Sequence, residues 1–353
     1  MNMPSQTVKL AGREVGPGQP VYIICEAGVT NYGEMELAKR QVDAAYEARA
    51  DVVKFQVTKT ENLISKKVAA RLQNELGYNW FDRVKYKEFS FDDVRELARY
   101  VRTGGYPFFA TAHDEEALDF LDREMQVPFF KIGSGESHNG DFLKSIGRRG
   151  KPVIISFGLQ SDAEAIRAVA TLRDAGAKDI IALHCTTLYP TPYDKIDLRR
   201  MLHLQEILEV PVGISDHSVG WHVVLAAVGL GACVVEKHLT FGKNDPRSLD
   251  NAGALLPHEF KVMVDQIRDL EQALRPIPED ERLRNLEKGR DWAGQSIVAK
   301  CDIPAGTVIA CDMLAFKRPA KGGLGPEMLG QLLGKKTNVD IPADEQILFD
   351  HLA

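Results

Sequence analysis

The chain alternates between short apolar runs and longer segments with helical spacing of their apolar residues. Segments such as ELAKRQVDAAYEAR and DAEAIRAVATLRDAG repeat apolar residues every three or four positions, which predicts amphipathic helices. The apolar runs between such segments predict buried strands, at residues 21–28, 51–56, 107–112, 129–135, 152–158, 180–186, 210–215 and 233–239. Alternation of this kind predicts an α/β fold, the closed (β/α)8 TIM barrel. An open doubly wound sheet is the alternative, but no GxGxxG sequence follows a predicted strand.

The pattern changes after the last helical segment of this series, HEFKVMVDQIRDLEQAL. The following stretch, RPIPEDERLRNLEKGRD, is highly charged and has few large apolar residues, which predicts an exposed linker. Short β-like runs with turn signals at IPAG and ACDM come next. We therefore expect a barrel domain at 1–275, a linker at 276–294 and a small β-rich domain at 295–353. The last is too short for a second enzyme domain and would cover or complete the barrel site.

The composition of the chain bears on its binding partners and on its cellular compartment. The chain carries 50 acidic and 44 basic residues, for a net charge of -6, and its basic residues are scattered. This distribution argues against nucleic acid or an anionic membrane as a partner. The five cysteines form no CxxC pair, and there is neither an N-terminal signal core nor an apolar run of membrane-spanning length. We expect a cytoplasmic protein with reduced thiols.

Two histidines stand at the ends of neighbouring predicted strands. His217 closes VPVGISDH and His238 closes CVVEKH, with one helix-length segment between them. Sites of α/β barrels lie at the carboxyl ends of the strands, so both imidazoles are expected at one mouth. They predict a divalent metal with open positions for an oxygen-rich substrate. The alternative is a pair of hydrogen-bonded structural histidines. Glu236 shares a strand face with His238 and is expected to orient it or to act in catalysis.

Lysines and hydroxyl groups gather at the same strand ends. Lys54 and Lys131 each interrupt an apolar run, and a buried ammonium needs a compensating anion. Neighbouring carboxylates are one possible partner, and a Schiff base is a further alternative. A phosphate cradle is the third reading, because hydroxyl groups follow the neighbouring strands. These hydroxyl groups belong to Thr111, Ser134, Ser156 and Ser215.

Glu26 and Glu136 end the first and fourth predicted strands. A single glutamate at a strand end is commonly a salt-bridge partner. Two that face one cavity, near lysines and a metal, can be held in different protonation states and share proton transfer.

These strand ends together resemble a known family. In this order, ICEAGVTNYG, ADVVKFQ, FFKIGSGE, LHCTTLYPTPY, GISDHS, VVEKHLT and KRPAKGG are similar to motifs of the sialic acid synthase family, from about Val21 to the end of the chain. The resemblance implies a metal-requiring TIM barrel joined to a small antifreeze-like (SAF, β-clip) domain. It also implies the condensation of phosphoenolpyruvate with the open-chain aldehyde of an N-acylated hexosamine, which yields a nine-carbon 2-keto sugar acid. Manganese is the expected metal, with magnesium or cobalt as alternatives.

The family motifs assign roles residue by residue. His217 and His238 would bind the metal, and Glu26 and Glu136 would flank the reacting carbons, with Glu136 preferred as the activator of water. The residues implied to hold phosphoenolpyruvate are Lys54, Thr111, Lys131, Ser134, Ser156 and Ser215. Those implied to face the sugar are Gln56, Asn74, Tyr189 and Asp250. In the small domain Arg318 would reach the sugar in a partner subunit's site, with Trp292 nearby, which implies a domain-swapped homodimer.

The sequence also departs from the family pattern around the sugar. TNYG replaces NHNG, ATAH replaces STPF, and SFG replaces STG, which introduces Tyr32, His113 and Phe157. Ala254 takes the place of a serine, and Gln295 that of an arginine. The simplest reading is an N-acetylneuraminate synthase that uses N-acetylmannosamine. Legionaminate-, pseudaminate- and Kdn-like products are alternatives, and a metal-dependent hydrolase and a non-catalytic sugar-binding protein are rivals from other classes.

Overall fold

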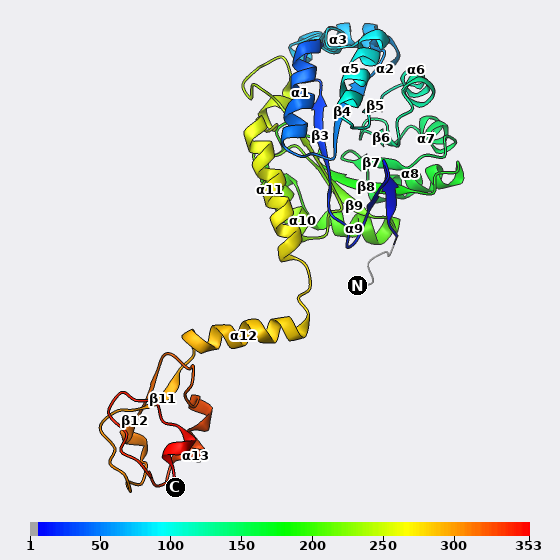
Figure 1. Cartoon of the computed structure of the whole chain (residues 1–353). Helices are drawn as coiled ribbons and strands as arrows, with labels where there is room; N and C mark the ends of the chain where they lie inside the picture. Colours follow the sequence, from blue (N-terminus) through cyan, green and yellow to red (C-terminus); the bar gives the residue numbers. More distant parts are fainter. Residues whose placement is uncertain (1–5) are drawn as a thin grey trace. The chain divides into compact units, whose positions relative to one another are not determined.

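The computed structural model describes residues 6–353, and the chain divides into two compact units, 1–274 and 275–353. The first unit contains eight parallel strands surrounded by helices (Figure 1). The strand order is β5-β4-β3-β10-β9-β8-β7-β6, and the two end strands, β5 and β6, also contact each other, so the sheet is nearly closed. The predicted barrel is thereby confirmed. The strands are β3 (Tyr22–Gly28), β4 (Val52–Val57), β5 (Phe109–Ala112), β6 (Phe130–Ile132), β7 (Val153–Phe157), β8 (Ile180–Cys185), β9 (Val212–Asp216) and β10 (Val234–His238).

Helices cover the outside of this sheet. In α5 (Phe91–Thr103) the buried residues Val94, Leu97, Ala98 and Val101 follow the spacing of one helix face. Ser90 begins the helix with a capping box to Asp93. The other helices of the outer layer are α1 (Met35–Glu47), α6 (Glu115–Asp119), α7 (Gly140–Gly147), α8 (Asp162–Asp174), α9 (Arg199–Leu208), α10 (His222–Gly229) and α11 (Pro257–Ala273). Three short helices, α2 (Thr60–Leu63), α3 (Lys66–Leu76) and α4 (Trp80–Lys85), lie between β4 and α5.

One end of the barrel interior is apolar. The buried residues of the hairpin of β1 (Val8–Leu10) and β2 (Arg13–Val15) belong to one apolar cluster with strand residues such as Tyr22 and Phe109 and with Phe129, just before β6. The polar side chains of the strands lie toward their carboxyl ends. This arrangement leaves the carboxyl-terminal mouth as the place for a site.

The second unit begins with α12 (Glu279–Ala293), which occupies most of the stretch expected to be a linker and buries none of its residues. An antiparallel pair follows, β11 (Ser296–Ala299) with β12 (Leu314–Lys317), together with isolated bridges such as Ile303 to Ile341. Ile297, Ile309 and Ile347 contribute to its own small apolar core. The β-rich character of this unit is as predicted. Within residues 6–353, no helix has both the length and the apolar character needed to cross a membrane.

Candidate active site

A cavity of about 600 Å³ opens at the carboxyl ends of the strands. Strand register brings its residues to one level, because Glu26 on β3 lies beside His238 on β10 and beside Lys54 on β4. A β-bulge follows Glu26 and leads into Gly28, whose φ of +49° favours glycine. The predicted residues that line this cavity are Glu26, Lys54, Gln56, Thr111, Lys131, Ser134, Glu136, Ser156, Tyr189, Ser215, His217, Glu236, His238 and Asp250.

Three predicted residues do not line the cavity. Asn74 is exposed on α3 and is absent from the cavity lining. Trp292, on α12, is 71% exposed, and Arg318, just after β12, is also exposed. The last two belong to the second unit, and their part in a partner's site stays a prediction.

A buried cluster of two lysines and two glutamates forms the floor of the cavity. Lys54 Nζ lies 2.5 Å from Glu26 Oε2 and 3.5 Å from Glu236 Oε2, and it donates to Thr111 Oγ1 at 3.1 Å. Lys131 Nζ lies 3.6 Å from Glu236 Oε1. Neighbouring carboxylates therefore lie beside both lysines. This is one of the three interpretations that the sequence left open for Lys54 and Lys131.

The two lysines are compensated to different degrees. Burial alone would lower the pKa of Lys54, but Glu236 and Glu26 more than offset it and raise that pKa. Burial lowers the pKa of Lys131, and Glu236 does not restore it. Lys131 otherwise donates to Ser156 Oγ at 2.8 Å and to the carbonyl oxygen of Ile132 at 3.2 Å. An additional anion is thus favoured next to Lys131.

Glu236 belongs to this cluster and makes no hydrogen bond to His238 within residues 6–353. Its Oε1 accepts from Ser215 Oγ at 2.8 Å, and its two oxygens face the two lysine ammonium groups. Burial opposes ionisation, but Lys131 and Lys54 lower the pKa of Glu236. The expected orientation of His238 by this carboxylate is not seen, because the lysines attract it more strongly.

The two candidate metal ligands lie close together, with ring centroids 5.3 Å apart. His217 Nδ1 donates to the carbonyl oxygen of Thr186 at 3.1 Å, which leaves Nε2 with its lone pair. His238 Nδ1 is buried without a hydrogen-bond partner. A nitrogen in this state suits a metal ligand. No group of three or more metal-binding side chains is found among the described residues, so these histidines would leave several positions to water or substrate.

His113, one of the departures from the family pattern, contacts the second candidate catalytic glutamate. His113 Nδ1 lies 3.1 Å from Glu136 Oε1, and both residues line the cavity. Burial alone would raise the pKa of Glu136, but His113 and Lys131 lower it overall. The sequence placed His113 beside Thr111, yet its pairing with Glu136 depends on a contact between β5 and the loop after β6 that spacing does not reveal.

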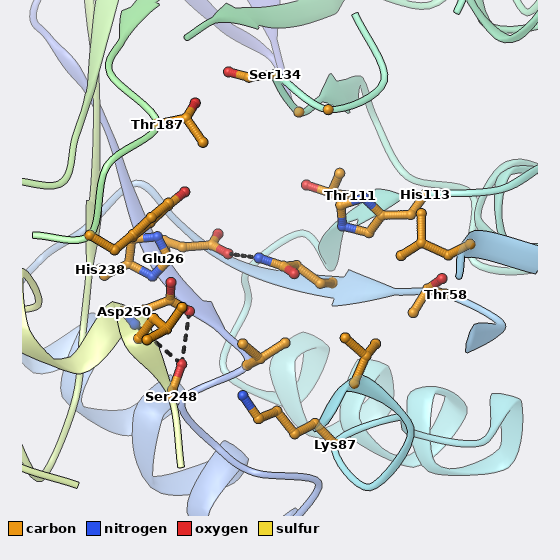
Figure 2. A pocket seen from close by; sticks show the side chains of 18 of the residues that line it. Glu26, Thr58, Lys87, Thr111, His113, Ser134, Thr187, His238, Ser248 and Asp250 are labelled. Carbon is orange, nitrogen blue, oxygen red and sulfur yellow. Dashed lines mark hydrogen bonds between the residues drawn. The ribbon is translucent and has the colours of Figure 1, made fainter. Parts of the chain in front are cut away.

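The remaining polar contacts lie on the side expected to face the sugar. Gln56 Nε2 donates to Glu26 Oε1 at 2.9 Å. Ser248 Oγ donates to Asp250 Oδ2 at 3.0 Å, as Figure 2 shows. The ring of Tyr189 lies 4.3 Å from that of His217. These groups offer hydroxyl, amide and carboxylate partners to a polyol.

Three other departures, Tyr32, Phe157 and Ala254, are buried outside the cavity lining. The hydroxyl oxygen of Tyr32 accepts from Asn251 Nδ2 at 2.8 Å, and its ring packs against the guanidinium of Arg247. Phe157 and Ala254 are each 1% exposed. None of these residues lines the cavity.

Comparisons with known proteins agree with the fold and identify the family. The chain matches the NeuB family over residues 41–277 and the SAF domain over residues 294–353. It is 35% identical over 350 residues to the N-acetylneuraminate-9-phosphate synthase of Homo sapiens, covering 98% of this chain and 96% of that protein. It is 36% identical over 331 residues to the N,N'-diacetyllegionaminic acid synthase of Campylobacter jejuni, covering 92% of this chain and 98% of that protein.

A solved structure extends this similarity to three dimensions. The N-acetylneuraminic acid synthetase of Leptospira borgpetersenii, in complex with citrate, gives a TM-score of 0.73 at 29% identity and covers 82% of this chain and 98% of that one. The resemblance seen in the strand-end motifs is thereby confirmed.

Proposed function

Because the chain belongs to the NeuB family, we propose that it condenses phosphoenolpyruvate with the open-chain aldehyde of an N-acylated hexosamine. The products would be a nonulosonic acid and phosphate. Its relatives are named as synthases of such acids, so the chain is an enzyme of this class. The observation that carries the proposal is a single cavity in which Lys131, incompletely compensated, shares the space with two histidines suited to a metal.

The lysine end of the cavity suits phosphoenolpyruvate. Ammonium and hydroxyl groups together hold carboxylate and phosphate oxygens through charge-assisted hydrogen bonds. Fixing both groups brings the enol carbon into reacting geometry, and such positioning can contribute about 7 to 11 kcal/mol to catalysis. The residues proposed for this task are Lys54, Thr111, Lys131, Ser134, Ser156 and Ser215.

The histidine end suits the aldehyde. His217 and His238 would hold a divalent cation, for which manganese is our first choice and magnesium and cobalt are alternatives. The chemistry that such a cation would supply is polarisation of the aldehyde oxygen, which would lower the barrier to attack by the enol carbon. Gln56, Tyr189 and Asp250 would position the sugar hydroxyl groups.

Glu136 is the proposed base. Its lowered pKa keeps it ionised near neutral pH, so that it can accept a proton from the water that adds to C2. A carbon–carbon bond forms first between C3 of phosphoenolpyruvate and the aldehyde carbon. Water then adds to C2, and phosphate leaves with cleavage of the C–O bond. Glu26, beside Lys54 and Gln56, would stabilise the positive charge that develops at C2.

We propose that the sugar is N-acetylmannosamine or a close relative of it. The human relative makes a phosphorylated acid, whereas the name of the Campylobacter relative mentions no phosphate, and the two are nearly equally similar to this chain. A cytoplasmic, domain-swapped homodimer is also proposed, in which the exposed Arg318 reaches the partner's site with Trp292 nearby. This part rests on the sequence resemblance.

The test is a direct assay. Purified protein with Mn²⁺, phosphoenolpyruvate and N-acetylmannosamine or its 6-phosphate should release phosphate and form a 2-keto acid. No phosphate release with a panel of N-acylated and neutral hexoses, free and phosphorylated, contradicts the synthase.

Two further measurements distinguish the synthase from the rival functions, a hydrolase and a non-catalytic sugar-binding protein. A hydrolase gives no reason for thermal stabilisation by phosphoenolpyruvate, whereas the synthase does. A non-catalytic sugar-binding protein predicts that His217→Ala leaves ligand affinity unchanged. The synthase predicts lost metal binding and lost turnover.

A further inference from the structure

Lys87 is a buried cation without an anionic partner on the wall of the active-site cavity. It follows α4, is 9% exposed and lines the cavity. Within the described range 6–353, its ammonium makes no hydrogen bond and has no carboxylate oxygen within 4.0 Å. The ring centroid of Tyr86 lies 5.7 Å from Nζ. Figure 2 shows its side chain directed toward Ser248 and Asp250.

A buried ammonium without an anionic partner is energetically unfavourable unless an anion binds beside it. Burial lowers the pKa of Lys87 to about 8. The carboxylate of Asp250 is the strongest opposing influence and Asp245 a smaller one, while the positive charges of Arg83 and Arg247 act in the same direction as burial. An ammonium in this state gains more from an incoming anion than one that already has a partner.

Arg83 brings a second positive charge to the same wall. It lines the cavity, donates to the carbonyl oxygen of Pro246 at 3.1 Å, and lies 4.6 Å from the ring centroid of Tyr78. It has no carboxylate partner among residues 6–353. Lys85, between the two, differs because it does not line the cavity and pairs with Glu61 at 3.0 Å. The two basic residues of this segment that line the cavity, Arg83 and Lys87, are therefore the ones left without a carboxylate partner.

We propose that Lys87 and Arg83 bind a phosphate monoester at the far end of the sugar, so that the substrate is a hexosamine 6-phosphate. This rests on the proposed function, in which the aldehyde end of the sugar lies at His217 and His238. A phosphate has three acceptor oxygens, which match an ammonium point charge and a guanidinium fork. Lys54 and Lys131 serve the other anion, phosphoenolpyruvate, so the cavity has separate cations for each substrate.

The experiment compares two sugars that differ only in this group. Phosphoenolpyruvate consumption is measured with Mn²⁺ and either N-acetylmannosamine or its 6-phosphate. We expect kcat/KM to be about 100-fold higher for the 6-phosphate, because two charge-assisted hydrogen bonds contribute about tenfold each. Lys87→Met should lower that ratio about tenfold, and Lys87→Arg should keep most of it. Lys85→Met is the matched control and should leave the ratio unchanged.

The outcomes separate the subsite from the synthase. Equal kcat/KM for the two sugars in the unmodified protein overturns the phosphate subsite and leaves the synthase standing. So does a Lys87→Met protein that keeps the full ratio. If neither sugar is turned over, both proposals fall. The comparison of the two sugars uses the unmodified protein. The proposal can therefore be refuted even if the Lys87→Met variant does not fold.

Discussion

The two buried lysines of the active site predict unequal losses of stability when each is replaced by methionine. In Lys54→Met the carboxylate of Glu26, which is 1% exposed, keeps only the hydrogen bond from Gln56. A buried carboxylate stripped of its cation costs about 3 to 5 kcal/mol. For a barrel of this size that corresponds to a fall in Tm of roughly 6 to 20 °C.

Lys131→Met should cost much less stability. Glu236 then keeps Lys54 at 3.5 Å and Ser215 at 2.8 Å, and the variant loses a contact of only 3.6 Å. It also removes a charge whose lowered pKa shows that folding disfavours it. We expect a change within about 1 kcal/mol. The KM for phosphoenolpyruvate should nevertheless rise about 10- to 150-fold, because a charge-assisted hydrogen bond contributes about 1.5 to 3 kcal/mol.

The measurements are thermal unfolding without metal or ligand and steady-state kinetics with varied phosphoenolpyruvate. Lys144→Met is the surface control, since its ion pair with Asp141 is exposed and should contribute less than about 1 kcal/mol. Equal losses of Tm for the two buried lysines refute the unequal compensation. An unchanged KM in Lys131→Met refutes its role in holding phosphoenolpyruvate.

Three further predictions concern the metal, the base and the loop behind them. Chelation should abolish turnover, and added Mn²⁺ should restore it. His217→Ala or His238→Ala should weaken Mn²⁺ binding more than about tenfold, as measured by calorimetry. Undiminished Mn²⁺ binding in these variants contradicts the metal site. Glu136 has a pKa below its usual 4.5, so its contribution to stability holds above that pH and is lost as pH falls through the lowered value. His113→Ala should raise this pKa and move the acid limb of kcat/KM to higher pH, and an unshifted limb argues against the pair. Gly253→Ala would place a Cβ 2.3 Å from the carbonyl oxygen of His217, so Tm and Mn²⁺ affinity should both fall; normal values for both count against this reading.

The barrel and most of its mouth were predictable because two strong rules apply to them. Apolar runs long enough for strands alternate with helical segments, and the carboxyl ends of parallel strands share one edge. Lys54 and Lys131 illustrate this, since each interrupts an apolar run and each points into the cavity. Their exact partners were not predictable, because the pairing with Glu236 depends on contacts across the barrel that sequence spacing does not determine.

Helix α12 shows what composition does not reveal. Its residues lack an apolar face, which suggested a linker, and the helix indeed buries none of its side chains. Intrahelical ion pairs help to support it instead, for example Arg284 with Asp280 at 2.7 Å and four residues apart. Lys87 was missed for a different reason. It lies among short helices between β4 and α5, where periodicity is too brief to show which side chains face the cavity.

The charge balance of the cavity floor bears on which reaction it serves. Lys54 and Lys131 are matched in number by Glu26 and Glu236, so the cluster alone is neutral. A divalent cation at the two histidines would add positive charge beside it, and the described residues bring no third metal-binding side chain to that point. An anion with carboxylate and phosphate groups would offset this charge. Cation and anion would then each strengthen the binding of the other, because coupling between sites is reciprocal. A hydrolase needs only the cation, whereas a synthase that joins phosphoenolpyruvate to an aldehyde needs both in one cavity.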